Sequence, residues 1–151
     1  MLMDIAVERA TPFDASTMAA LHQNCFPRPW DEAAMATFIA SLDTICLLAS
    51  INDDSRRTPA GFLIARKAAD EAELLTLAVA LQWRRAGLGS ALVKSAMATL
   101  GESGATRLFL EVEDGNEAAL RLYRSLGATA VGRRARYYEH RADAAIFSLA
   151  L

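Results

Sequence analysis

The segment Arg84-Arg85-Ala86-Gly87-Leu88-Gly89-Ser90 joins a strand-like run, Leu74–Ala80, to a helical pattern with apolar residues at every fourth position over Leu88–Leu100. Such a junction points several backbone amides outward at the positive end of a helix dipole, where glycine lets an anion approach the main chain. Arg84 and Arg85 add positive charge. The segment is therefore a candidate phosphate-binding loop, and the alternative is a turn with two incidental arginines.

Two familiar kinds of phosphate loop do not fit this segment. A P-loop ends in Gly-Lys-Ser/Thr, whereas Gly89 is followed by Ser90 and Ala91. A dinucleotide fingerprint needs glycine or alanine at the position of Leu92 and follows an early strand. What remains is Arg-x-x-Gly-x-Gly after a strand, late in a small mixed domain.

A second polar cluster ends the next expected strand, Thr106–Val112, and begins the next helix. The apolar run Leu108–Leu110 predicts a central strand that is buried on both faces. Glu111 shares a face with Phe109, and burial of a carboxylate is costly unless the group is paired or used. Glu111 is therefore a candidate catalytic group, and the alternative is a solvated residue just past the buried part.

The helix expected over Asn116–Leu126 has an asparagine start and a glycine stop at Gly127. Asn116 and Tyr123 lie seven residues apart, nearly two turns, so they project from one face. The expected core stripe consists of Ala119, Leu122 and Leu126. Each polar residue also has a simpler interpretation: Asn116 as a helix cap and Tyr123 as an amphipathic rim residue.

Apolar periodicity and turn residues predict the remaining elements. Strands are expected over Asp4–Arg9, Thr44–Ile51, Ala60–Lys67, Thr129–Tyr138 and Asp143–Leu149, and helices over Asp14–Cys25 and Asp31–Ser41. Pro27 and Pro29 separate the two helices, and the polar stretch Asn52–Pro59 is expected to form a hairpin loop. No segment repeats, so one domain is expected over residues 1–151.

The composition is that of a globular domain, with 151 residues, 53% hydrophobic and 23% charged residues and a net charge of -2. The longest apolar runs, such as Leu74–Leu81, are far below the ~18 residues of a membrane span. Asp4 and Glu8 interrupt any secretory signal, which predicts a cytoplasmic protein. Cys25 and Cys46 are then expected to be small buried hydrophobic residues in a reducing compartment.

Taken together, these motifs resemble the GNAT superfamily of N-acetyltransferases. The resemblance is carried by Leu74–Val79, by Arg84-x-x-Gly87-x-Gly89 and by Leu110-Glu111-Val112-x-x-x-Asn116-x-x-Ala119-x-x-Leu122-Tyr123-x-x-x-Gly127. Within this superfamily the chain looks most like the bacterial ribosomal-protein-alanine N-acetyltransferases; the resemblance covers nearly the whole chain in element order and is also suggested by Cys25–Trp30 and Arg136–Tyr138. The resemblance implies an α/β fold with a mixed sheet: about seven mostly antiparallel strands, four helices, and a parallel, splayed central strand pair.

The same resemblance implies acetyl-CoA as the donor, without a metal. The cofactor-binding residues that it implies are Leu77, Ala78, Val79, Arg84, Arg85, Ala86, Gly87, Leu88, Gly89, Ser90, Asn116 and Tyr123. The pyrophosphate then lies on the amides of Arg85–Ser90, and the pantetheine arm pairs with Leu77–Val79. Glu111 is expected to be the general base through a water, and Tyr123 to protonate the leaving thiolate. The Val79 amide is expected to stabilise charge on the carbonyl oxygen.

The implied acceptor is a protein N-terminus, namely the alanine of a ribosomal protein. An α-amine has a pKa of about 7.7–8.0 against about 10.4 for lysine, so more of it is neutral at neutral pH. The residues expected beside the acceptor are Trp30, Glu113, Tyr137 and Tyr138; for the aromatic ones the alternative is ordinary packing. The branch usually has arginine in place of Glu113 and phenylalanine in place of Ala128, which changes the charge near the acceptor and the packing, respectively.

Other interpretations stay open at this point. A related enzyme can instead acetylate lysine, a small-molecule amine or aminoacyl-tRNA, and a catalytically silent acetyl-CoA-binding module is a further possibility. A basic cluster that suits RNA phosphate consists of Arg133, Arg134, Arg136 and Arg141. The net charge of -2 argues against a nucleic-acid partner, and such a basic run is more commonly a solvated strand face.

His22 and His140 have no second ligand at metal spacing, so no metal site is expected. The oligomeric state is left open.

Overall fold

The computed structural model describes residues 4–135 and 142–151, and the strands in this part form one mixed sheet. They are β1 (Asp4–Arg9), β2 (Thr44–Asp53), β3 (Arg56–Ala68), β4 (Glu71–Val79), β5 (Arg107–Glu113), β6 (Thr129–Arg134) and β7 (Ala144–Ala150). The sheet order is β1-β2-β3-β4-β5-β7-β6. β4 and β5 are parallel and pair over only three residues, Glu71–Glu73 with Arg107–Phe109, whereas β1–β2, β2–β3, β5–β7 and β6–β7 are antiparallel.

Four α-helices complete the described part of the chain. They are α1 (Ala15–Cys25), α2 (Glu32–Ala40), α3 (Leu88–Glu102) and α4 (Glu117–Ser125), with short 3-10 turns η1 (Pro12–Asp14) and η2 (Leu81–Trp83). Seven strands, four helices and the parallel central pair confirm the fold class that the sequence predicts. None of these helices has the length and apolar character needed to cross a bilayer.

The chain folds into two compact units. The first consists of Met1–Arg66 and Leu75–Ala96, and the second of Lys67–Leu74 and Met97–Leu151. β4 and α3 each contribute residues to both units. The expectation of one domain over residues 1–151 stays a prediction.

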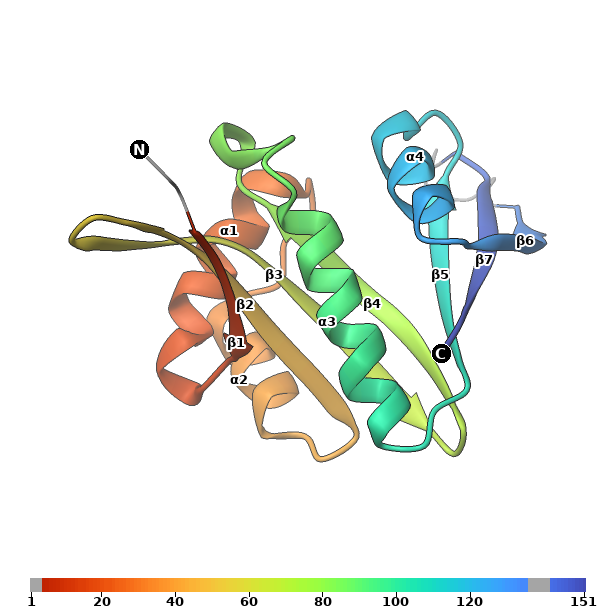
Figure 1. Cartoon of the computed structure of the whole chain (residues 1–151), viewed down its shortest axis with the longest axis horizontal. Coiled ribbons are helices and arrows are strands. Elements are labelled where there is room, and N and C mark those ends of the chain that lie inside the picture. The colour runs from red at the N-terminus through yellow and green to blue at the C-terminus, as the bar shows by residue number, and fades with distance from the viewer. Residues whose placement is uncertain (1–3, 136–141) are drawn as a thin grey trace. The chain divides into compact units, whose positions relative to one another are not determined.

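The core of the first unit lies between the sheet and the pair α1 and α2. Met18 of α1 and Met35 of α2 are fully buried against Phe62 and Ile64 of β3, where the apolar spacing of each helix directs them. Figure 1 shows α1 and α2 on one face of β2 and β3. Asp31 caps α2 by accepting a 2.9 Å hydrogen bond from the Ala34 amide.

The hairpin between β2 and β3 differs from the expected loop over Asn52–Pro59. Both strands continue through that stretch, and the turn itself is Asp54 and Ser55. Cross-strand pairing explains the difference, because Asn52 pairs with Arg57 in the ladder and Arg57 forms a 2.9 Å ion pair with Glu8 of β1. The polar composition of the stretch therefore reflects exposed strand faces rather than a loop.

In the second unit, β5 alternates between its two faces. Leu108, Leu110 and Val112 are buried, whereas Phe109 and Glu111 are half-buried. The expected burial of both faces is therefore met only in part, because side chains of a strand alternate and one set lies deeper in the core than the other. The following helix begins after Asn116 and ends before Gly127, which has a φ of +93°, as the sequence predicts.

Candidate active site

The loop between β4 and α3 begins where β4 ends at Val79. One 3-10 turn, η2, follows, and Arg84 and Arg85 lead into the helix, which starts at Leu88. The loop is held by its own main chain, with 2.9 Å from the Trp83 amide to the Ala80 carbonyl and 3.4 Å from the Ala86 amide to the Trp83 carbonyl. The first unit thus contains the strand, loop and helix start of the predicted phosphate site.

Two left-handed residues shape this loop. Arg85 has a φ of +68° and Gly87 a φ of +88°. A left-handed arginine is strained, and such residues bring neighbouring backbone N–H groups into a concave, anion-binding arrangement. Within residues 4–135 and 142–151, no hydrogen bond involves the amides of Gly87, Leu88 or Gly89. The loop therefore offers free donors at the start of a 15-residue helix.

The side chain of Arg84 binds the end of β4. Its Nε donates a 3.3 Å hydrogen bond to the Val79 carbonyl oxygen, and a terminal nitrogen lies 4.0 Å from Cys25 Sγ. Cys25 Sγ donates to the same carbonyl at 3.4 Å. Cys46 is buried as expected, and burial raises its pKa to about 11. Cys25 is only half-buried: it packs against the edge of the core, and its thiol reaches the strand end.

Gly61 of β3 allows the end of β4 to lie close to the β3 backbone. An ideal Cβ at Gly61 would lie 2.7 Å from the Ala78 carbonyl oxygen, closer than real side chains come. The backbones of β3 and β4 therefore approach each other only because residue 61 has no side chain. Ala78 is buried, and Leu77 and Val79 on either side are half-buried.

In the second unit, Glu111 of β5 is held by an arginine of β6, which lies beyond the intervening strand β7. Its carboxylate lies 3.0 Å from Arg134 Nε, and its side chain is 29% exposed. The strand register explains the pair. Arg134 of β6 and Glu113 of β5 both lie opposite Ala144 of the strand between them, β7. Glu111 is two residues from Glu113 and therefore on the same face of the sheet. The carboxylate is thus paired and still reaches solvent, as a general base requires.

The helix α4 buries one large side chain, Tyr123. It is 5% exposed, and burial raises its pKa to about 12, so the hydroxyl keeps its proton at neutral pH. The expected core stripe is only half-buried, at Ala119, Leu122 and Leu126. Tyr123 takes the central position because it lies four residues after Ala119 and three before Leu126, within the same stripe.

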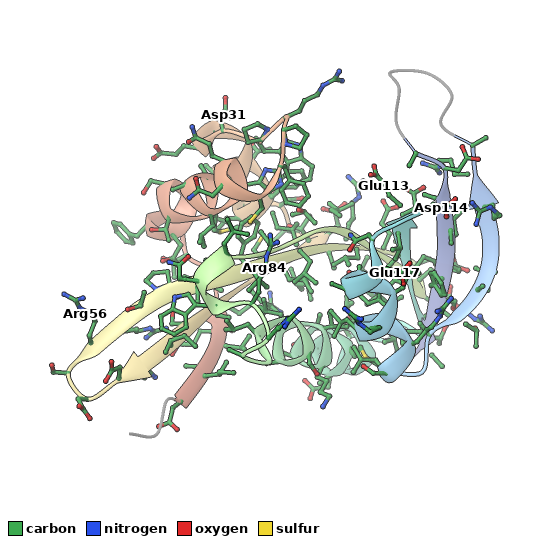
Figure 2. The ribbon with its side chains drawn as sticks, turned by 90° about the horizontal axis from the view of Figure 1, so that it is seen from above. Asp31, Arg56, Arg84, Glu113, Asp114 and Glu117 are labelled. Atoms are coloured by element: carbon green, nitrogen blue, oxygen red, sulfur yellow. The ribbon has the colours of Figure 1, made fainter. Side chains whose placement is uncertain are left out.

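Asn116 caps α4. Its Oδ1 accepts a 3.2 Å hydrogen bond from the Ala119 amide. The side chain is therefore a helix cap, which is the simpler of the two roles that the sequence allows. The cap uses the oxygen and leaves the amide nitrogen of the exposed side chain as a donor. Figure 2 shows Glu113, Asp114 and Glu117 around the turn between β5 and α4.

The described half of the basic cluster is neutralised. Arg133 pairs with Asp114, and Arg134 pairs with Glu111. Arg136 and Arg141, like Tyr137, Tyr138 and His140, lie outside the described residues. Among the residues that are described, no group of three or more histidine, cysteine or acidic side chains could hold a metal ion.

Aromatic rings gather between α1 and α2 in the first unit. Trp30 stacks on His22 with ring centroids 4.9 Å apart, and the Phe38 ring lies tilted against Trp30 with centroids 5.0 Å apart. Spacing alone missed His22, because its partners are Trp30 and, 54 residues away, Thr76. The pair formed by Glu111 and Arg134 was missed for the same reason.

The comparisons with known proteins agree with this geometry. A family model described as the acetyltransferase (GNAT) family matches residues 15–128. Over 136 residues the chain is 35% identical to the ribosomal protein bS18-alanine N-acetyltransferase of Escherichia coli K12, covering 87% of this chain and 88% of that protein. The crystal structure of the ribosomal-protein-S18-alanine N-acetyltransferase from Escherichia coli has a TM-score of 0.83 at 29% identity, covering 97% and 94%. Arabidopsis thaliana NAA60 in complex with acetyl-CoA has a TM-score of 0.86 at 20% identity, covering 98% and 100%, a likeness of fold.

Proposed function

The chain belongs to the acetyltransferase (GNAT) family, with acetyl-CoA as its donor, and we propose that its acceptor is the α-amine of a protein N-terminus. A relative aligned over 87% of this chain is named for the alanine of ribosomal protein bS18, so we extend the proposal to an N-terminal alanine of a ribosomal protein. An α-amine, with a pKa of about 7.7–8.0, is also easier to deprotonate than lysine. A cytoplasmic location, where such an acceptor is made, belongs to the same proposal.

The observation that carries the donor site is the set of free amides in the β4–α3 loop. Acetyl-CoA, when bound, supplies an activated thioester, so the chain need not provide a nucleophilic side chain. In our proposal the segment from Arg85 to Ser90 holds its pyrophosphate, with the free amides of Gly87, Leu88 and Gly89 as donors, and the backbone of Leu77–Val79 pairs with the pantetheine arm. The Val79 amide stabilises the negative charge that develops on the carbonyl oxygen.

Glu111 is the proposed general base. A half-buried carboxylate that keeps contact with solvent can take a proton from an amine through a water. The 3.0 Å contact with Arg134 holds the carboxylate in one orientation. Because the side chain is also 29% exposed, the oriented carboxylate can reach a water, which supports the role.

Tyr123 is the proposed general acid. Its burial keeps the hydroxyl protonated, with a pKa of about 12, so a proton is available for the leaving thiolate. Asn116 presents its amide nitrogen to the cofactor arm in this proposal, while its oxygen caps the helix. Asn116 is the N-cap residue of α4, and Tyr123 lies within the helix near its end.

Acceptor choice is assigned to Trp30 and Glu113. Trp30 offers a half-buried ring for a small first residue. Glu113 is exposed, and a carboxylate there favours basic peptides and disfavours acidic ones. We therefore expect an Ala-Arg N-terminus to be a better acceptor than an Ala-Glu one at low salt, and Glu113→Arg to narrow or reverse the gap.

The test measures CoA release with two peptides: one with a free N-terminus and no lysine, and one with a blocked N-terminus and a lysine. We expect the first to be acetylated faster, and Glu111→Gln to lower its kcat by ~10²-fold or more while acetyl-CoA affinity stays the same. Glu117→Gln is the matched control, because it removes an exposed carboxylate on α4. Faster acetylation of the lysine peptide contradicts the α-amine proposal, and wild-type turnover by Glu111→Gln contradicts the assigned base.

A further inference from the structure

His22 is a buried histidine on α1 whose two ring nitrogens both have partners. It is 3% exposed. Its Nδ1 accepts a 3.0 Å hydrogen bond from the backbone N–H of Trp30, and its Nε2 lies 3.1 Å from the Thr76 hydroxyl on β4. Phe26 stacks on the ring with centroids 4.3 Å apart, and Trp30 stacks on it at 4.9 Å. One imidazole thus links α1, the segment 26–30 and β4.

The partners define the protonation state of the ring. The Trp30 N–H can only donate, so Nδ1 carries a lone pair and the proton of the neutral imidazole is on Nε2, where it donates to Thr76. A second proton on Nδ1 would face the Trp30 N–H and break that bond. Burial lowers the pKa of His22, which agrees with a neutral ring.

The last turn of α1 is attached to β4 at a second point. Cys25 Sγ donates to the Val79 carbonyl oxygen at 3.4 Å, at the end of the strand whose backbone is assigned to the donor. After this turn the chain leaves the helix, and Pro27 and Pro29 prevent it from forming regular hydrogen bonds. The His22 ring therefore supplies one contact that holds this segment beyond the last helical bond, which runs from the Phe26 amide to the His22 carbonyl.

We propose that His22 is a positioning residue that orients Trp30 and the segment 26–30 for binding of the amine acceptor. The inference rests on the proposed function only in taking Trp30 as an acceptor contact. The ring acts through Trp30 and touches neither the donor nor the amine. Its removal is therefore expected to weaken acceptor binding selectively.

Two variants separate the hydrogen bond from the packing. His22→Phe keeps a stacked ring but leaves the Trp30 N–H without an acceptor, whereas His22→Asn places Oδ1 near the position of Nδ1 and keeps an acceptor for it. We expect His22→Phe to raise the peptide KM by about tenfold with kcat and the acetyl-CoA Kd changed by less than about twofold, and His22→Asn to recover most of the loss. Hydrogen exchange of the Trp30 amide should accelerate in His22→Phe and not in His22→Asn.

Leu63→Ala is the control for a general loss of stability, because it removes a fully buried side chain of β3. It should lower the free energy of unfolding and leave the peptide KM unchanged. An unchanged peptide KM in His22→Phe, or an equal loss in His22→Phe and His22→Asn, overturns the positioning role. Wild-type protein that acetylates neither peptide overturns the proposed function instead, so the two failures are distinguishable.

Discussion

Replacing Gly61 by alanine tests the close approach of β3 to the end of β4. The new Cβ would lie 2.7 Å from the Ala78 carbonyl oxygen, whereas C···O contacts normally lie at about 3.3–3.6 Å, so the two backbones must separate by roughly 0.6–0.9 Å. Overpacking of this kind costs about 1–3 kcal/mol, and alanine offsets about 0.4–1 kcal/mol of it by restricting the unfolded chain. We expect the free energy of unfolding to fall by a net amount between about 0 and 2.6 kcal/mol, with a midpoint of about 1.3 kcal/mol.

Two assays measure this effect, urea denaturation for stability and calorimetry for acetyl-CoA binding. The shift moves the backbone of Ala78 and Val79, which is assigned to the pantetheine arm. Loss of one main-chain hydrogen bond, worth about 0.5–1.5 kcal/mol, should raise the acetyl-CoA Kd by roughly two- to tenfold. A folded variant that binds more weakly is the expected result.

Gly101→Ala is the matched control. Its Cβ would meet only Leu151 Cβ at 3.9 Å, an ordinary contact, and the residue lies within α3. Alanine in a helix should stabilise the protein by about 0.5–1 kcal/mol and leave acetyl-CoA binding unchanged. If Gly61→Ala is as stable as the wild type and binds acetyl-CoA equally well, the argument from the 2.7 Å approach is refuted.

Three other substitutions give further tests. Tyr123→Phe should lower kcat and preserve the acetyl-CoA Kd, and an unchanged single-turnover rate would contradict the role of the hydroxyl as an acid. In the wild type, a hydroxyl with a pKa of about 12 stays protonated, so it should cause no loss of activity through about pH 10. Gly87→Glu should abolish acetyl-CoA binding in calorimetry. Gly87→Ala adds only the strain of a side chain at a φ of +88° and should weaken binding less. If the two variants bind acetyl-CoA with equal affinity, the result argues against a pyrophosphate at this loop. Burial lowers the pKa of His22, so the unfolded chain takes up a proton first as the pH falls below about 6.5, and the unfolding free energy should decline with it. Urea titrations at several pH values should show a smaller decline of the unfolding free energy in His22→Asn than in the wild type. If the two proteins lose stability in parallel as the pH falls, the assignment of this pH dependence to His22 is contradicted.

Most of the secondary structure was predictable because its signals are local. The helix from Leu88, the cap at Asn116 and the stop at Gly127 depend on residues within one or two turns of each other. The stripe of α4 was misassigned although its period was correct, because a large aromatic ring at Tyr123 takes the buried position that the leucines were expected to fill. The β2–β3 hairpin was misread because exposed strands and loops share a polar composition.

The loop with its two glycines, the carboxylate of Glu111 on the strand that follows, and the family to which they belong were all readable from residue order. The contacts that adjust those groups were not. Arg134 reaches Glu111 across an intervening strand, and His22 meets Thr76 54 residues away along the chain. Such pairs depend on sheet register and on how a helix packs on the sheet, and both are set by the summed burial of many distant side chains rather than by the spacing around any one residue. The sequence therefore shows which titratable side chains the protein has, but the tertiary structure decides their partners and their protonation states.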